Sequence, residues 1–336
     1  MESKASDGQN DFNDKPPGNI PHFSAVSMAE ISADDPAFRI TTRTGIEDLV
    51  DSIPKLGLIH PPVLIRNFSG YKVVCGFRRI AACRHLRWSR ITARVLEQTA
   101  DRLQMAQLAI ADNALQRSLN LVEASRALNL LSDVCPDRTQ FGQTALVLGL
   151  PVNPSLVAKV KKICRLPCKI QESILAGTIG MSMALALGIL DQPTGEAVLK
   201  MFDQLKLGLN KQRELLLLLK EIASREDRSV RQLIAEKPLQ KILADDQLDR
   251  ATKRQKIRSF LQQRRYPSIS RAADHYAKKI KQLKLGNNIN LIPPRNFEDT
   301  AFTMILRFNN RENLSDLKKK IEEIIAHPAF AEILDR

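Results

Sequence analysis

The stretch Tyr71–Cys83, which reads YKVVCGFRRIAAC, constrains the fold of this chain more than any other. An apolar run, Val73–Cys75, is interrupted by Gly76, and a helix-compatible segment with Arg78 and Arg79 follows. This order predicts a strand, a glycine turn and the start of a helix. The unpaired N–H groups of a helix start and the forked guanidinium groups of arginine both suit phosphate oxygens. The alternative is a plain turn followed by solvated arginines.

The flanking sequence extends this pattern into a small α/β domain over residues 36–97. The segment Thr44-Gly-Ile-Glu47 is a T-x-x-E capping box, which predicts a helix that starts there and ends at Gly57. Two short strands around a turn are expected next, and Ile91–Leu96 is expected to form a third strand.

From Ala100 to about Leu285 the apolar positions recur with helical periodicity. We expect helices at Ala100–Leu115, Leu121–Val134, Ile170–Ala176 and Met181–Leu190, and we expect Asn120 to cap the second of them with Glu123 at N3. Within this region a helix at Thr139–Leu148 ends at Gly149, and a turn leads into the basic helix Ser155–Ile163. This order is typical of a helix-turn-helix, whose second helix enters the major groove of DNA. An ordinary helical hairpin is the alternative. The residues that we expect to contact DNA are Thr139, Gln140, Asn153, Ser155, Lys159, Lys161, Lys162, Lys253 and Arg254.

The charge of the chain points to a polyanionic partner. The 336 residues carry a formal net charge of +14, although residues 1–38 hold seven acidic residues against two lysines. Residues 251–284 contain eleven Lys or Arg and one acidic residue. Such an excess favours nucleic acid as the partner, with largely non-specific backbone contacts in the second region. A solvated basic surface is the alternative there.

The cysteines argue against a metal site and against an extracellular protein. The five cysteines are an odd number, and the C-x3-C pair Cys164 and Cys168 has no second pair or histidine cluster near it. No signal peptide or long apolar run is visible, so we expect a cytoplasmic protein with reduced thiols and no membrane segment.

The two ends of the chain differ from its middle. Residues 1–36 are polar and acidic, which predicts a disordered arm. The last region, 286–336, is expected to form two strands and a helix. Because about 50 residues bury little surface alone, we expect this region to dimerise. Residues 246–285 are expected to form a basic linker or helix.

Several ordered motifs resemble the ParB partition protein family, also called ParB/RepB. One set runs from Leu49 through Ser52-Ile53, Gly57-Leu58-Ile59 and Pro61 to Gly70-Tyr71 and Gly76-x-Arg78-Arg79-x-x-Ala82. A second set, from Asp112-Asn113 to Glu123, resembles the family's E-N-x-x-R region. The resemblance covers residues 36–330.

The resemblance implies an α+β protein made of three folded parts. These are an α/β nucleotide-binding domain at 37–118, an all-α helix-turn-helix domain at 119–245 and a small α+β dimerisation domain at 286–336. Proteins of this family are homodimeric clamps that bind CTP with Mg²⁺, load at a centromere-like DNA site, slide on double-stranded DNA and act with a ParA-type ATPase. We therefore expect a nucleoid-associated protein of chromosome or plasmid segregation.

The resemblance also assigns roles to residues of the first domain. Asn113 would bind the metal ion, and Asp112 stands where the family has a glutamate linked to hydrolysis. The residues expected to bind the nucleotide are Gly57, Leu58, Pro61, Gly76, Arg78, Arg79, Asn113, Gln116 and Arg117.

Several positions depart from the family pattern, among them His60, Arg87 and the spacing of Gln116-Arg117. Phe77 replaces the glutamate of the G-E-R-R box, and Asp112 is one methylene shorter than the usual glutamate, so we expect CTP binding with at most weak hydrolysis. Met183 and Leu185 replace a histidine and an arginine that read the usual site. Because those base contacts are lost, we expect a different DNA target.

Three alternatives remain from the sequence. The first is a transcription regulator of the same fold that spreads on DNA, and the second is a DNA-binding scaffold whose pocket binds no nucleotide. The third is an enzyme, because related folds occur in nucleases and sulfiredoxin-like phosphotransferases. The glycine turn contains no cysteine of the sulfiredoxin type, and the sequence shows no paired carboxylates of a nuclease. Neither feature therefore supports an enzyme.

Overall fold

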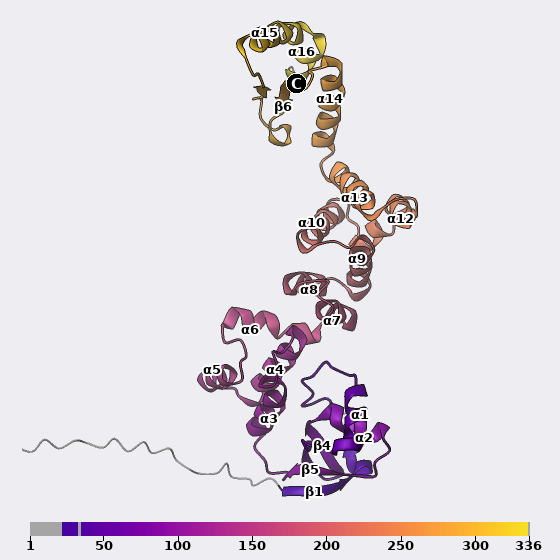
Figure 1. Ribbon diagram of the computed structural model, residues 1–336, viewed down its shortest axis with the longest axis vertical. Helices are drawn as coiled ribbons and strands as arrows, with labels where there is room; N and C mark the ends of the chain where they lie inside the picture. The colour runs from indigo at the N-terminus through magenta and orange to yellow at the C-terminus, as the bar shows by residue number, and fades with distance from the viewer. Residues whose placement is uncertain (1–21, 33–34, 335–336) are drawn as a thin grey trace, which may run out of the picture. The chain divides into compact units, whose positions relative to one another are not determined.

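The computed structural model describes residues 22–32 and 35–334. The chain divides into two compact units, Met1–Gln192 and Pro193–Arg336, whose helices and strands are labelled in Figure 1. The first unit contains the sheet and the expected helix-turn-helix, and the second contains the basic helix and the C-terminal strands.

The described part of the first unit contains a five-stranded sheet in the order β1-β5-β3-β4-β2. The strands are β1 (His22–Ser27), β2 (Ile31–Ser32), β3 (Val63–Asn67), β4 (Gly70–Cys75) and β5 (Arg90–Leu96). β3 pairs antiparallel with β4 and parallel with β5, while β1 pairs antiparallel with β5 and β2 pairs parallel with β4.

The sheet separates two hydrophobic cores. Along β3, Leu64 packs into a core with α1 (Glu47–Leu56) and α2 (Phe77–His85), whereas Val63 and Ile65 pack into the other core. Successive residues of a strand point to opposite faces, so this division places helices on both sides of the sheet.

Residues 22–32 correct the expected extent of the acidic arm. They form β1, a 3₁₀ turn at Met28–Glu30, and β2, and Val26 is buried. The rest of the expected arm, residues 1–21, lies outside the described residues. Composition averaged over 36 residues concealed the segment HFSAVS, whose backbone pairs with β5 from His22↔Val95 to Ser27↔Arg90.

The capping box expected at Thr44 is also wrong. Helix α1 begins at Glu47 with Ile46 at the N-cap position, and no side chain caps it. The carbonyl oxygen of Gly45 instead accepts a hydrogen bond from Arg78 Nε at 2.6 Å, so a tertiary contact holds this turn. The predicted end is confirmed, because Gly57 is the C-cap with a φ of 73°.

The helices of the first unit begin and end close to the predicted residues. They are α3 (Arg102–Ala114), α4 (Leu121–Val134), α5 (Arg138–Val147), α6 (Pro154–Val160), α7 (Cys168–Leu175) and α8 (Met181–Gly188), with a 3₁₀ turn at Ile163–Arg165. Asn120 caps α4, and its capping box with Glu123 is confirmed. One core joins Val74 of the sheet, Leu128 of α4 and Val160 of α6, so packing is continuous across residue 118.

The second unit is helical until its last strands. Its helices are α9 (Gln192–Leu205), α10 (Leu209–Arg225), α11 (Val230–Ile234), α12 (Lys237–Ala244), α13 (Arg250–Arg265) and α14 (Pro267–Leu283). Then come β6 (Ile289–Ile292), a 3₁₀ turn at Arg295–Phe297, β7 (Thr303–Leu306), α15 (Arg311–Ala326) and α16 (Pro328–Leu334). None of the described helices is long and apolar enough to cross a lipid bilayer.

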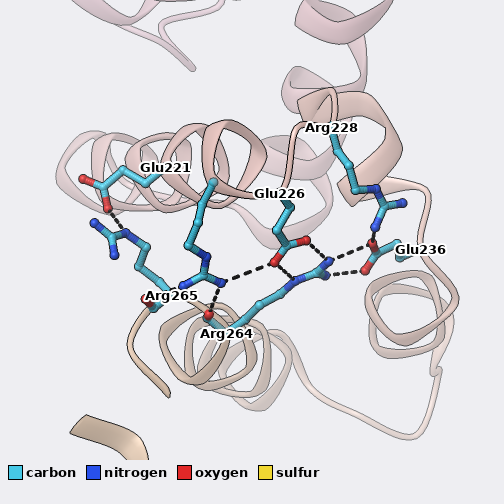
Figure 2. Close-up of polar contacts among 7 residues, drawn as sticks. Glu221, Glu226, Arg228, Glu236, Arg264 and Arg265 are labelled. Carbon is cyan, nitrogen blue, oxygen red and sulfur yellow. Dashed lines mark hydrogen bonds and ion pairs between the residues drawn. The ribbon is translucent and has the colours of Figure 1, made fainter. Parts of the chain in front are cut away.

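An ion-pair cluster centred on Arg264 fixes the carboxyl end of α13. Figure 2 shows the Arg264 guanidinium between Glu226 and Glu236, with Arg264 Nε 2.8 Å from Glu226 Oε1. Arg225 Nη1 donates to the carbonyl of Arg265 at 2.9 Å, which satisfies a free helix-end acceptor. The hydrogen bonds from Arg264 hold the pKa of Glu226 and of Glu236 below the usual glutamate range.

Replacing Arg264 should destabilise the second unit and leave the first unchanged. Arg264→Met leaves two part-buried carboxylates without their shared cation, and we expect a loss of about 2 kcal/mol in the free energy of unfolding. Urea unfolding followed by far-UV circular dichroism measures both units, while the single tryptophan, Trp88, reports on the first. The control is Arg258→Met, because Arg258 is 60% exposed beside Glu214 and its loss should matter little. Equal effects of the two variants would contradict the role of the cluster.

Candidate functional site

The turn between β4 and α2 opens into a pocket of about 460 Å³. The segment before α1, the last turn of α3 and the turn that follows α3 supply other walls. Among the predicted residues, those that line it are Gly76, Arg78, Arg79, Asp112, Asn113, Gln116 and Arg117. The structure therefore brings together residues that lie about 40 positions apart in the sequence.

Three predicted residues do not line this pocket. Gly57 ends α1, and Leu58 packs against the core beneath α1 and α2. The carbonyl of Pro61 lies 3.4 Å from Arg79 Nη1, so Pro61 contacts a pocket residue through its backbone.

The turn at position 76 requires glycine for two reasons. Gly76 is the N-cap of α2 with a φ of 89°, in the left-handed region. A Cβ atom there would lie 2.9 Å from Pro62 Cβ and 3.1 Å from Arg79 Nε. The absence of a side chain lets Arg79 turn back across the start of the helix toward α3.

The two arginines of the turn are held by different partners. Arg78 Nη2 lies 2.6 Å from Asp48 Oδ1 on α1, where the Asp48 side chain is 64% exposed. Arg79 Nη1 donates to the carbonyl of His60 at 2.6 Å, and its Nη2 lies 3.1 Å from both carboxylate oxygens of Asp112. Arg79 thus connects α2, the segment before β3 and α3 at the pocket wall.

Asp112 and Asn113 offer oxygen ligands at the pocket. The Asn113 amide nitrogen donates to the carbonyl of Ala109 at 3.1 Å, and no donor among the described residues reaches its amide oxygen. A carboxylate beside an amide oxygen suits Mg²⁺, which is commonly held by one or two protein ligands together with phosphates. No group of three or more His, Cys, Asp or Glu that could hold a metal occurs among the described residues.

A buried carboxylate ties the pocket to α4. Glu123 is fully buried and accepts hydrogen bonds from Arg117 Nη1 at 2.7 Å and Nη2 at 2.8 Å. It also accepts from the backbone N–H groups of Thr42 at 2.9 Å and Asn120 at 3.2 Å. Burial alone would raise the pKa of Glu123, but these hydrogen bonds lower it from 4.5 to about 2. The guanidinium of Arg117 is therefore already engaged at the edge of the pocket.

Sequence reasoning missed part of the pocket. The lining residues not predicted as nucleotide ligands include Phe38, Thr41, Arg43, Leu49, His60 and Phe77. Phe38, Thr41 and Arg43 come from a segment without regular structure before α1, which no local pattern marks. Cys75 is buried beside the pocket, and burial and then Asp112 raise the pKa of its thiol to about 12.

The helix pair α5 and α6 carries the other predicted site. Its residues Thr139, Gln140, Ser155, Lys159 and Lys162 are exposed, and Lys161 is half-buried. Asn153 is the N-cap of α6, because its side chain accepts from the N–H of Leu156 at 3.0 Å. Gly149 turns the chain between the helices with a φ of 68°. The two helices border a hollow of about 610 Å³.

Lys253 and Arg254 lie in the other compact unit, on α13. Lys253 Nζ donates to the carbonyl of Leu243 at 2.8 Å, and Arg254 Nη1 lies 3.4 Å from the carbonyl of Leu205. Both side chains are half-buried and close the carboxyl ends of neighbouring helices. Their predicted contact with DNA would have to replace these hydrogen bonds.

Comparison with known proteins gives the class of the first domain. Residues 18–114 match the family described as ParB N-terminal domain. The chain thus contains a ParB N-terminal domain, and its resemblance to the ParB family is confirmed.

Two curated relatives extend the match beyond this domain. A nucleoid occlusion protein of Lysinibacillus sphaericus is 30% identical over 157 residues, which is 46% of this chain and 51% of the relative. A probable chromosome-partitioning protein ParB of Helicobacter pylori is 24% identical over 177 residues, or 53% of this chain and 59% of that protein. The chain thus spans about half the length of these relatives.

One solved structure matches a comparable share of the chain. It is the C-terminally truncated chromosome-partitioning protein ParB of Caulobacter crescentus complexed with CTP-γ-S, at 21% identity and a TM-score of 0.25. The match covers 51% of this chain and 94% of that one. A score this low does not establish a shared overall arrangement.

The depressed pKa of Glu123 predicts acid sensitivity in the first unit. The folded-state pKa lies below the unfolded value, so the stabilisation is present above about pH 4.5 and is lost as the pH falls toward 2. Glu123→Gln should lower the free energy of unfolding by about 3 kcal/mol at pH 7 and flatten its fall below pH 4.5. Urea unfolding followed by Trp88 fluorescence at several pH values measures both effects. Asp133→Asn, an exposed change on the same helix, should keep the slope of the parent; an unchanged slope in Glu123→Gln would contradict this account.

Proposed function

We propose that this chain is a ParB-like, CTP-gated DNA clamp that acts in DNA segregation. The observation that carries the proposal is the convergence of Gly76, Arg78 and Arg79 with Asp112 and Asn113 in one pocket. A glycine turn at a helix start, two arginines and the Asn113 amide oxygen are groups that suit a nucleoside triphosphate with Mg²⁺.

The nucleotide would bind with its phosphates at the start of α2. The N–H groups of the first turn and the Arg79 guanidinium face the pocket and would donate to phosphate oxygens. Arg78 would exchange Asp48 for a phosphate, because the exposed pair with Asp48 is weak and easily replaced. Asn113 would hold Mg²⁺, which supplies positive charge to the phosphate oxygens when bound.

Hydrolysis of CTP by this chain would be weak. A residue that activates water needs a free oxygen within reach of it. Both carboxylate oxygens of Asp112 already lie 3.1 Å from Arg79 Nη2, and its short side chain limits its reach. These contacts favour binding over turnover at the site.

The clamp would hold double-stranded DNA through the helix pair α5 and α6. Lys159, Lys161 and Lys162 come from one turn of chain beside Arg165, and the net charge of the protein is strongly positive. Phosphate contacts of this kind make binding tight at low salt and weaker at high salt. A centromere-like site would be bound first and neighbouring DNA afterwards.

Within a cell the proposed clamp would lie in the cytoplasm on the nucleoid and act with a ParA-type ATPase on a chromosome or plasmid. A second candidate is a DNA-spreading regulator, which the similarity to a nucleoid occlusion protein favours. The two roles differ in the need for the ATPase. If the chain is a partition protein, loss of the ATPase would abolish DNA segregation. If it is a regulator, its occupancy of DNA would be unchanged.

The nucleotide proposal predicts selective loss of CTP binding. Arg79→Ala removes the side chain that joins His60, Asp112 and the start of α2, and it should weaken Mg·CTP binding at least tenfold by isothermal titration. Arg78→Ala should act in the same direction. DNA binding by α5 and α6 should be retained, because neither arginine contacts those helices.

The matched control is Arg90→Ala, since Arg90 is exposed at the start of β5 and does not line the pocket. ATP and GTP titrations test the choice of base. A parent protein that binds no CTP with Mg²⁺ present would overturn the proposal; joint loss of CTP and DNA binding in Arg79→Ala would indicate misfolding instead.

The C-terminal strands are proposed as the dimer contact. β6 and β7 pair antiparallel, and Ile289 and Leu291 face a core with α14 and α16. The opposite face carries Ile292 and Ile305, each 39% exposed, and Phe308 follows at 53%. A two-stranded sheet with an uncovered apolar face is marginal alone, and a second copy would cover it.

The dimer should depend on this C-terminal region. Light scattering after gel filtration should give a dimer for the full chain and a monomer after removal of residues 286–336. Ile305→Asp places a charge on the proposed contact and should also give a monomer, while Leu217→Asp on the exposed side of α10 serves as the control. A dimer that survives both the truncation and Ile305→Asp would contradict the assignment.

A further inference from the structure

Helix α6 presents an apolar surface where a DNA-reading helix usually presents hydrogen-bond donors. Throughout Pro154–Val160, all of which is described, there is no Arg, Asn, Gln, Asp or Glu. Asn153 precedes the helix, but its side-chain oxygen caps the N–H of Leu156. The exposed donors on α6 are Ser155 and Lys159, and Leu156 is 38% exposed between them.

The hollow between α5 and α6 combines apolar walls with cations. Its apolar lining includes Val152, Pro154, Val157 and Ala158, and Val152 is 48% exposed. The cations that line the same hollow are Arg138, Lys161, Lys162 and Arg165. A surface with both apolar and cationic side chains suits a polyanion that presents methyl groups to the apolar walls.

The edges of bases in the major groove offer one such group. Guanine, adenine and cytosine present donors and acceptors that Arg, Asn, Gln or carboxylates read in pairs, whereas thymine also presents a C5-methyl group. Apolar side chains such as alanine contact that methyl group. The walls of the hollow can therefore recognise thymine and have little to offer the polar edges of the other bases.

We propose that the hollow between α5 and α6 reads thymine C5-methyl groups in the major groove, so that the preferred DNA site is rich in thymine at the positions facing Val152 and Ala158. Ser155 and Lys159 read the neighbouring purine edges, and the lining cations contact phosphates. This inference rests on the proposed DNA binding. The same surface could bind an apolar protein segment, but four cations on its lining favour duplex DNA.

The first experiment selects preferred duplexes from a random pool with the full chain at fixed salt. Each thymine of the selected site is then replaced by deoxyuridine, which removes only the C5-methyl group. We expect the dissociation constant to rise about fourfold for each contacted methyl group, the effect of one buried methyl group. Replacement outside the selected site should leave the constant unchanged.

A protein variant connects this effect to the hollow. Val152→Ala shortens an exposed wall residue and should bring the ratio of deoxyuridine to thymidine dissociation constants toward one. The control is Val147→Ala, which makes the same change at a residue that is 78% exposed on α5 and does not line the hollow. It should keep the ratio of the parent.

The outcomes separate this inference from the proposed function. If the chain binds a preferred duplex and deoxyuridine leaves the dissociation constant unchanged, thymine reading is overturned and the proposed DNA clamp is not. Binding to duplex DNA without any sequence preference has the same consequence. Failure to bind any duplex overturns both and turns attention to a protein partner. If Val147→Ala lowers the ratio of deoxyuridine to thymidine dissociation constants as much as Val152→Ala does, the methyl groups are contacted elsewhere. That result overturns the assignment to this hollow.

Discussion

The buried carboxylate of Glu123 is the interaction on which the first unit depends. A charge removed from water is costly unless donors surround it, and here the fork of Arg117 and the N–H groups of Thr42 and Asn120 provide them. Those donors come from the loop before α1, the turn after α3 and the start of α4. One carboxylate therefore holds together three segments that local helix or strand preferences would leave unconnected.

Helix α4 carries this constraint from the pocket to the helix pair α5 and α6. At its start lie Glu123 and Arg126, and Arg126 donates to the carbonyl of Thr41 at 2.9 Å. About one turn after Arg126, Asn129 donates to the carbonyl of Lys161 at 2.8 Å. Helix α4 thus contacts both the loop around Thr41 and the segment that follows α6. In the proposed clamp, this helix would physically connect the nucleotide site with the DNA site.

Local features could be predicted from the sequence, whereas features set by contacts between distant residues could not. The β4–Gly76–α2 turn and the Asn120–Glu123 box are encoded within a few residues, and both are found where predicted. The box at Thr44 failed because Arg78, 34 residues later, holds the adjacent turn. Glu123 could be recognised as a capping residue, but nothing local marked Thr42 and Arg117 as its donors. The pairing of β1 with β5 was missed for the same reason.

The strand order has a practical consequence for where the domain can be cut. β1 and β2 are the outermost strands of the sheet, and both come from residues 22–32. A fragment that starts at residue 37 would expose the unpaired backbone of β5 on one side and of β4 on the other, next to Ile91 and Val73. Uncovered strands of this kind pair with further copies of themselves. By pairing with β5 and β4, the strands of residues 22–32 thus protect this sheet from aggregation.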